Sequence, residues 1–250
     1  MKIKSTLMYG GLGVLAYLIF LVTSFPIEHA LKLVRGQMQG VYAQTLTGTV
    51  WRGRAAKIQV QDQAFERVSW DVKLLSVALG QLEIDVAFSG NGRKGQGTLA
   101  LGSDGSLSLI NFTGSIPISE IDHYFNLPVD IGGLADVKLD KVSLMGESIT
   151  YAEGQVRWKS GKVTSPLAIK LGDFLVTLST DEAGIKGVLK DEGGPVDING
   201  IAQLSADNSY TFSGKIAPRG GQNSMLAQGI RALGRAGPDG RIALEYSGKL

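Results

Sequence analysis

Few side chains in this sequence have the types and spacing that catalysis or metal binding requires. The sequence contains two histidines, His29 and His123, and no cysteine. Metal sites usually gather several His, Cys or carboxylate ligands. Asp122 is only the sequence neighbour of His123, and neighbours on a helix do not face each other. Thiol nucleophiles, disulfides and zinc-thiolate sites are excluded outright. We therefore predict no enzyme activity, no metal site and no cofactor.

Two short stretches have part of the pattern of a ligand-binding loop. Gly90–Gly95 matches the glycine spacing of a dinucleotide-binding loop, which needs a helix directly after it. A β pattern, Thr98–Leu101, follows instead, so we interpret the match as a β-turn. Asp197–Gly200 begins like a calcium loop, but the later bidentate glutamate is absent. Neither stretch predicts a bound ligand.

The composition limits the classes of partner. Lys and Arg total 25 against 23 Asp and Glu, and the net charge is +2. No run of five basic residues occurs, which argues against a nucleic-acid partner. Glycine accounts for 34 of 250 residues, about double the ~7% average of soluble proteins. That content, among alternating apolar residues, predicts many tight turns and short strands.

One apolar run, Ser5–Phe25, has no charged residue and is 21 residues long. A bilayer-spanning helix needs about 20 such residues. Three interpretations compete: a retained anchor, a cleaved signal peptide and a buried core helix. The run is longer than the ~7–15 residues of a signal core and has no A-x-A at its end. It also lacks the polar face of a globular helix, so we favour the retained anchor.

The basic residues around this run predict its orientation. Lys2 and Lys4 precede it, and the long segment after it would translocate largely regardless of charge. We therefore expect a cytoplasmic tip at residues 1–4, a single transmembrane helix at 5–25 and a juxtamembrane helix or linker at 26–40. Residues 41–250 would form a β-domain outside the cytoplasm, and in a bacterium that space is the periplasm.

From residue 41 onward, apolar and polar residues alternate over many short stretches. In Leu82–Phe88, four apolar residues share one face and Glu83 and Asp85 lie on the other. Such alternation is typical of half-buried antiparallel strands, and roughly 12 to 15 strands are expected. Met225–Leu233 breaks the pattern with a helical spacing of apolar residues. A weak internal repeat suggests two halves, 41–120 and 128–250.

The chain carries an ordered series of short motifs that resembles one known family, protein N of the type II secretion system. The L-x-G-x-V-W-x-G-x-A element contains Gly48, Trp51 and Gly53. V-x-W and L-G-x-L elements follow, with Trp70 and Gly80. The second half carries the following elements: G-x-V-x-W with Gly154 and Trp158, LAIKLGDFLVTL at 167–178, Y-x-F-S-G-K-I-x-P-R with Tyr210, Gly214, Pro218 and Arg219, and D-G-R-x-x-L at 239–244. Arg235–Pro238 departs from the acidic stretch expected there.

This resemblance implies an inner-membrane accessory component of the type II secretion machinery, which supports export of folded periplasmic proteins across the outer membrane through protein–protein contacts. It implies partners among the other secretion subunits and no catalytic residues, so we interpret the motif residues as structural. Trp51, Trp70 and Trp158 could pack in the core or form a surface for a partner or lipid. A fainter resemblance to AsmA-like proteins implies the alternative, a periplasmic β-groove that binds or transports lipid.

The two resemblances imply the same fold class. It is mainly β, with an elongated, curved antiparallel sheet that is AsmA-like or sandwich-like. One N-terminal transmembrane helix and short accessory helices complete it.

Overall fold

The computed structural model describes residues 24–27, 29, 41–60, 63–120, 130–165, 168–220 and 224–249. Its strands form one antiparallel sheet of 13 strands, in the order in which they occur in the chain. The prediction of a mainly β, antiparallel fold is thus confirmed. The described strands form one sheet, whereas the sandwich-like alternative requires two.

No helix in the described ranges is long and apolar enough to cross a bilayer. The expected tip at 1–4, all but the last two residues of the run at 5–25, and most of the linker at 26–40 lie outside these ranges. The anchor therefore stays a prediction.

The chain divides into two compact units, residues 1–91 and 92–250. Unit 1 contains β1 (Val41–Gly48), β2 (Arg52–Val60), β3 (Gln63–Val72), α3 (Leu74–Ala78) and β4 (Leu82–Gly90). These bounds differ from the two related halves expected at 41–120 and 128–250, so that internal relationship stays a prediction.

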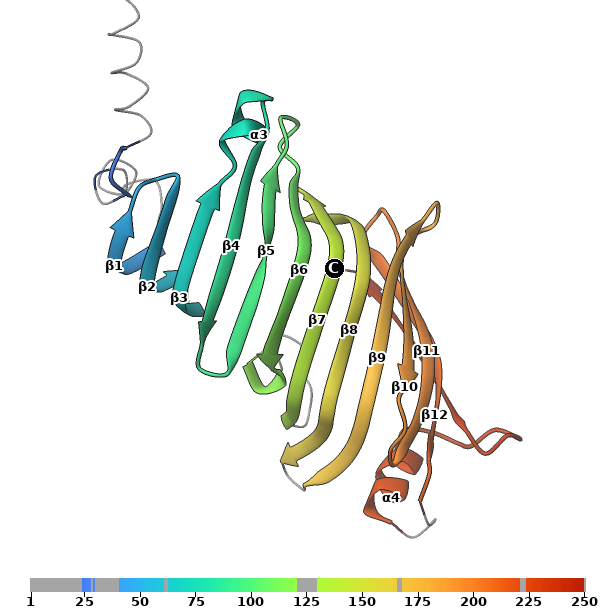
Figure 1. Ribbon diagram of the computed structural model, residues 1–250. Helices are drawn as coiled ribbons and strands as arrows, with labels where there is room; N and C mark the ends of the chain where they lie inside the picture. Colours follow the sequence, from blue (N-terminus) through green and yellow to red (C-terminus); the bar gives the residue numbers. More distant parts are fainter. Residues whose placement is uncertain are drawn as a thin grey trace, which may run out of the picture. The chain divides into compact units, whose positions relative to one another are not determined.

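Unit 2 contains the longer strands and a second helix (Figure 1). Its elements are β5 (Arg93–Leu101), β6 (Leu107–Pro117), the 3-10 helix η1 (Ile118–Glu120), β7 (Asp130–Met145), β8 (Ser148–Ser165), β9 (Ile169–Asp181), β10 (Gly184–Asp191), β11 (Val196–Leu204), β12 (Ser209–Pro218), α4 (Met225–Ala232) and β13 (Ile242–Lys249).

Short polar turns join the strands, as their residue types predict. Asp104 accepts hydrogen bonds from the backbone N–H and the hydroxyl of Ser106, at 3.0 and 2.6 Å. Asp207 does the same with Ser209 at the same two distances. Asn91 and Gly92 form a turn with φ of 51° and 77°. The GxGxxG match is therefore part of a β-turn, and β5 follows it.

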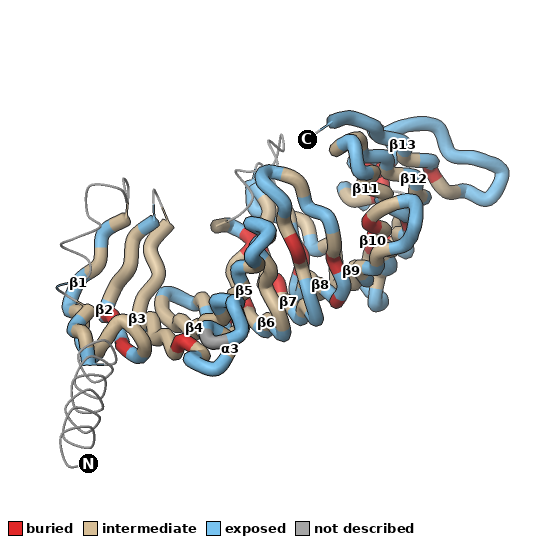
Figure 2. Tube along the Cα trace, turned by 90° about the horizontal axis from the view of Figure 1, so that it is seen from above, coloured by how far each residue is buried: buried red, intermediate tan, exposed pale blue. Residues whose placement is uncertain are grey.

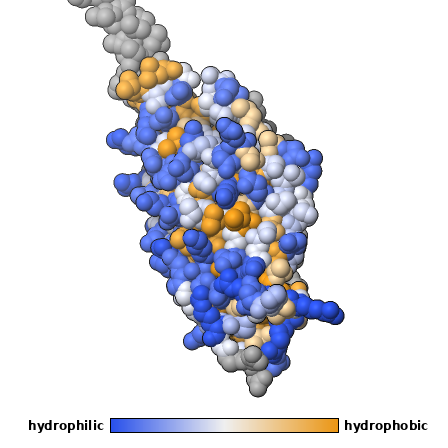
Figure 3. Space-filling view, turned by 90° about the vertical axis from the view of Figure 1, so that its right-hand side faces the viewer, coloured by the Kyte–Doolittle hydropathy of each residue, from blue (hydrophilic) through white to orange (hydrophobic). Residues whose placement is uncertain are grey.

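The buried residues form small groups, not a continuous layer. Figure 2 shows them as short separate segments along the strands. The face seen in Figure 3 is mostly hydrophilic, with hydrophobic side chains gathered in patches. In unit 2 one cluster joins Phe174, Val196, Ile230 and Ile242. It brings β9, β11, β13 and α4 together, and it forms the floor and wall of the site described next.

Candidate functional site

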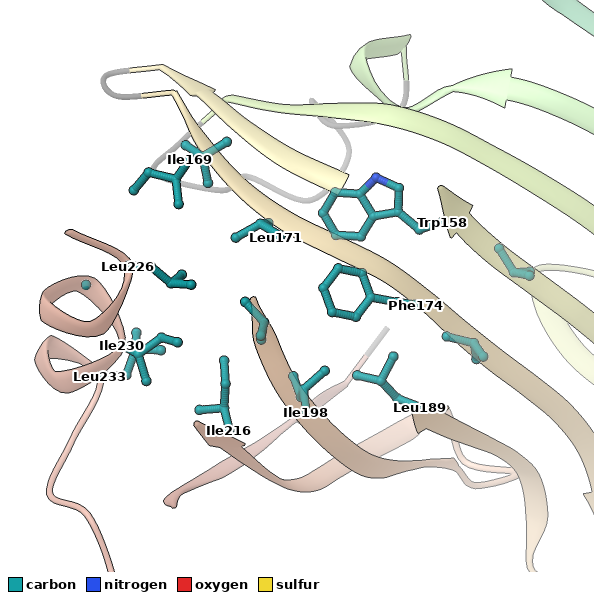
Figure 4. A pocket seen from close by; sticks show the side chains of 15 residues that line it. Trp158, Ile169, Leu171, Phe174, Leu189, Ile198, Ile216, Leu226, Ile230 and Leu233 are labelled. Carbon is teal, nitrogen blue, oxygen red and sulfur yellow. The ribbon is translucent and has the colours of Figure 1, made fainter. Parts of the chain in front are cut away.

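Unit 2 contains an apolar pocket of about 630 Å³. Strands β8 to β12 form its floor, and α4 closes one side. Its lining consists of apolar side chains and one glycine: Val156, Trp158, Val163, Ile169, Leu171, Phe174, Val176, Leu189, Val196, Ile198, Ile216, Leu226, Gly229, Ile230 and Leu233. Figure 4 shows the side chains of α4 facing those of the strands across the open space.

Local sequence places α4 against the sheet. The Ser224 hydroxyl accepts a hydrogen bond from the Ala227 N–H at 3.1 Å and caps the first turn, which satisfies one otherwise free donor. Leu226, Ile230 and Leu233 recur on one face, and the structure turns all three into the pocket. The helical spacing of apolar residues over Met225–Leu233 predicted this helix and its apolar face, and both are confirmed.

Trp158 and Phe174 form the aromatic part of the floor. Their ring centroids lie 5.3 Å apart, within the range of favourable aromatic pairs. The Trp158 indole N–H donates to the Gly132 carbonyl at 3.1 Å. A Cβ on Gly133 would lie 2.5 Å from that indole nitrogen, so only glycine lets the strand β7 approach the ring so closely. The sequence alone leaves open whether Trp158 is a core or a surface residue, and in the structure it lines the pocket.

A charged network ties the strand ends beside the pocket together. Arg219 pairs with Asp191 on β10 and with Asp197 on β11, and Asp197 also pairs with Arg241. Asp191 further accepts the N–H groups of Gly193 and Ile198, each at 3.1 Å. Because these partners come from four parts of the chain, the network fixes the β10–β11 connection relative to β12 and β13.

The network lowers the pKa of both carboxylates. Burial alone raises the pKa of Asp191, but the Arg219 guanidinium and the two N–H donors outweigh it and hold that pKa below its ordinary value of 3.8. The hydrogen bond from Arg241 is the largest influence on Asp197 and likewise lowers its pKa. A lowered folded-state pKa adds stability above the unfolded value, and this stability is lost as pH falls through the folded pKa.

We therefore expect unit 2 to lose stability as pH falls below about 4. Asp191→Asn should lower the free energy of unfolding by on the order of 1 kcal/mol at neutral pH, since the ion pair is partly exposed. The variant should also lose less stability than the wild type when the pH falls. Denaturant unfolding at several pH values measures both. Glu147→Gln, in the exposed β7–β8 turn, is the control and should leave the acid response unchanged; an equal response in both variants would contradict this prediction.

In unit 1, four of the motif residues predicted from sequence meet at the β1–β2 hairpin. Gly48 and Gly53 pair across it, and a Cβ on Gly53 would lie 2.3 Å from a ring carbon of Trp70. The Trp70 indole donates to the carbonyls of Thr49 and Val50, at 3.3 and 3.1 Å. Trp51 is half-buried in the turn. The conformation of this hairpin thus depends on Trp70 lying over Gly53.

The other motif residues lie apart from that hairpin. Gly80, with φ of 78°, follows the C-terminus of α3. In unit 2, Gly154 lies opposite a bulge in β7 between Leu139 and Lys141, and Gly214 pairs with Gly200. A Cβ added to Gly248 would lie 2.6 Å from the Tyr210 hydroxyl oxygen.

Three motif residues lie at the pocket. Trp158 lines it, Pro218 pairs with the lining residue Val196, and Arg219 donates to the Val196 carbonyl at 3.4 Å.

Sequence reasoning missed most of the pocket lining. Alternation predicts strands at Phe174, Leu189 and Ile198, but it does not predict that they share a pocket. The LAIKLGDFLVTL element contained the signal, since four lining residues of β9 come from it. Within the described ranges no group of three or more His, Cys, Asp or Glu side chains could hold a metal ion.

A single antiparallel sheet with an apolar pocket defines the class of protein by its fold, a mainly β protein. Comparison with known proteins identifies its family. The chain belongs to the family described as "Type II secretion system (T2SS), protein N", which matches residues 39–245. The resemblance drawn from the motifs is thus confirmed.

Three relatives align along the full length. A type II secretion system protein N of Aeromonas hydrophila is 22% identical and covers 99% of this chain and 100% of its own. One of Vibrio cholerae is 26% identical with the same coverage. One of Pectobacterium carotovorum is 20% identical over the whole of both chains. No solved structure matches the chain.

Proposed function

We propose that this protein is an inner-membrane-anchored accessory component of the type II secretion system. It would support export of folded periplasmic proteins across the outer membrane through contacts with other subunits of that system. The family match over residues 39–245 carries the proposal. The run Ser5–Phe25 supplies the anchor, with the N-terminus in the cytoplasm and the β-domain in the periplasm.

The sheet offers one mode of contact with other subunits. The strands β1 and β13 are the two edge strands of the described sheet, and each pairs with only one neighbouring strand in it. The start of β13 is covered by a bridge between Ala236 and Ile242, whereas Glu245 to Lys249 are exposed. Exposed backbone donors and acceptors at such an edge can pair with a strand of another protein.

Gene deletion tests the role in secretion. We expect secreted proteins to accumulate in the periplasm of the deletion strain, and expression of the full chain to restore their release. Release at the wild-type rate without the gene would contradict the proposal. Fractionation and protease access to intact spheroplasts test the anchor separately, because a periplasmic β-domain should be degraded from outside while the protein stays with the inner membrane.

Site-specific photo-crosslinking tests the edge. A photoreactive residue in place of Tyr246, which is 58% exposed on β13, should crosslink a secretion subunit in cells. The same residue in place of Glu147, in the β7–β8 turn, is the control. Equal crosslinking at both positions would indicate that β13 is not the contact.

The pocket favours a second candidate function, lipid binding. Its volume of about 630 Å³ lies within the ~300–1,000 Å³ of small-molecule sites. The apolar lining suits an acyl chain, whose burial is worth about 0.8 kcal/mol per CH₂. The charged residues around Arg219 lie at the strand ends, outside the lining.

A pocket-filling variant tests this second function. Gly229 lines the pocket, and outside its chain neighbours and the backbone of its own helix no atom lies within 4 Å of a Cβ built there. Gly229→Phe should therefore occupy the space. We expect native mass spectrometry to find lipid bound to the wild-type protein and to find less bound to Gly229→Phe. Arg231→Phe, on the exposed side of the same helix, should retain it. A lipid-free wild-type protein would refute this function.

A further inference from the structure

The connection between β3 and β4 exposes an unusual amount of apolar surface. We call residues 74–82, sequence LLSVALGQL, the α3 tip; it contains no charged residue. Leu75 and Leu79 are each 77% exposed, Leu74 is 49% exposed and Val77 is 39% exposed. Soluble monomers rarely expose contiguous apolar patches of this kind without a binding role.

The other exposed hydrophobic residues beside turns have a different setting. Leu101 and Leu107 flank a turn that carries Asp104, and Met145 and Ile149 flank a turn that carries Glu147. Isolated apolar residues of that sort are common on protein surfaces. The α3 tip differs because its exposed side chains follow one another without an intervening charge.

The backbone holds the tip in a defined shape. The Lys73 N–H donates to the Glu83 carbonyl at 2.9 Å, which joins the end of β3 to the start of β4. The Gln81 N–H donates to the Ser76 carbonyl at 2.9 Å, and Gly80 ends the helix with φ of 78°. The leucines therefore lie on a closed loop at the ends of strands β3 and β4, where Figure 1 shows α3.

The same end of unit 1 receives the last residues of the apolar run Ser5–Phe25. The Val50 N–H donates to the Phe25 carbonyl at 3.1 Å, and Pro26 forms a β-bridge with Thr49. The Val72 N–H donates to the Trp51 carbonyl at 2.6 Å. The turn at 49–51 thus links the end of the run on one side to the base of the α3 tip on the other.

Charged pairs lie just inside the tip, at the strand ends. Lys73 pairs with Glu83 and Asp85, at 3.3 and 3.2 Å. Arg52 donates to Asp71 at 2.7 Å. These pairs form a charged belt at the base of the apolar tip, and Trp51 lies at the same level, opposite Val72. The same groups occur together at a membrane interface, where tryptophan is enriched and charge stays with the headgroups.

We propose that the α3 tip inserts into the surface of the membrane that holds the run Ser5–Phe25 and so gives unit 1 a second lipid contact. This inference rests on the proposed anchor. The contact is apolar, and its charged belt contains both signs, so it does not require anionic lipid and resists salt. With two attachments, unit 1 has a fixed orientation on the bilayer.

The test uses full-length protein in vesicles of zwitterionic lipid. The sequence has no cysteine, so single-cysteine variants accept an environment-sensitive fluorophore at one position each. Leu75→Cys and Leu79→Cys report on the tip. Val60→Cys, an exposed apolar residue at the opposite end of β2, is the matched control, and Leu15→Cys reports on the anchor.

We expect the labels at positions 75 and 79 to show blue-shifted emission and strong quenching by lipids that carry a quencher near the headgroup. The label at 60 should show neither effect, and the label at 15 should be quenched best by a quencher deep in the acyl region. High salt should leave these results unchanged.

The outcomes separate the tip from the anchor. The inference would be overturned if the labels at positions 75 and 79 behaved like the label at position 60. If the label at position 15 were still quenched from deep in the acyl region, the anchor would remain supported. No quenching at 15 would refute the anchor itself. Adding Leu75→Asp to the Leu79→Cys protein should abolish the shift at 79, and a persistent shift would also count against insertion.

Discussion

Trp158→Ala is expected to lower the free energy of unfolding of unit 2 by about 3–5 kcal/mol, the usual range for removing a large aromatic side chain from a core. The ring packs at 5.3 Å from Phe174, and its N–H is bonded to Gly132. Its loss would enlarge a pocket that is already about 630 Å³, and it would remove a side chain that packs against the buried cluster of Phe174, Val196, Ile230 and Ile242. Denaturant unfolding followed by far-UV circular dichroism measures the change.

Trp158→Phe separates packing from hydrogen bonding in the same experiment. It keeps most of the ring and loses the bond to Gly132, so it should cost about 1 kcal/mol. If Trp158→Ala lowered the free energy of unfolding no more than Trp158→Phe does, the packing of the tryptophan ring would not stabilise this unit.

Gly154→Ala is expected to cost about 2–5 kcal/mol. Gly154 has φ of 143°, and a Cβ would lie 2.4 Å from the Lys138 carbonyl oxygen and 2.6 Å from the Leu139 Cα. A side chain in the left-handed region costs about 1–2 kcal/mol, and forcing extra atoms into a filled site costs about 1–3 kcal/mol more. The obstructing atoms belong to the backbone of β7, so a rotamer change cannot relieve the contact. Thermal and denaturant unfolding measure the loss.

Gly105→Ala is the control for backbone strain. Gly105 has φ of 81° and open space around its Cβ position, so only the conformational part, about 1–2 kcal/mol, should appear. Equal losses in the two variants would show that the approach of β7 to Gly154 contributes nothing.

The sequence predicted the type of fold well because period-two alternation is a strong and local signal. In Leu82–Phe88 it predicted β4. The helix α4 was predictable because Leu226, Ile230 and Leu233 recur at helical spacing. The helix α3 was not predicted, since a five-residue helix between two strands has too few turns to show a period.

The pocket could not be predicted because bulges change which face of a strand a residue occupies. In β8, the lining residues Val156 and Trp158 have even residue numbers, whereas the lining residue Val163 has an odd one. The β8–β9 register shifts between Trp158 and Lys162. In β9 the lining likewise changes from Ile169 and Leu171 to Phe174 and Val176. An extra residue in a strand reverses the faces after it, and alternation read from the sequence cannot locate that reversal.

The strand order has a consequence for how the chain acquires its structure. Every strand pairs with its neighbours in sequence, so sheet pairing closes only short stretches of chain. Folds made of such near-neighbour contacts form quickly, since little loop entropy must be overcome. A chain that emerges N-terminus first could add each strand to the last one already in place. The growing edge would always be the newest strand, and among the described strands β13 would join last.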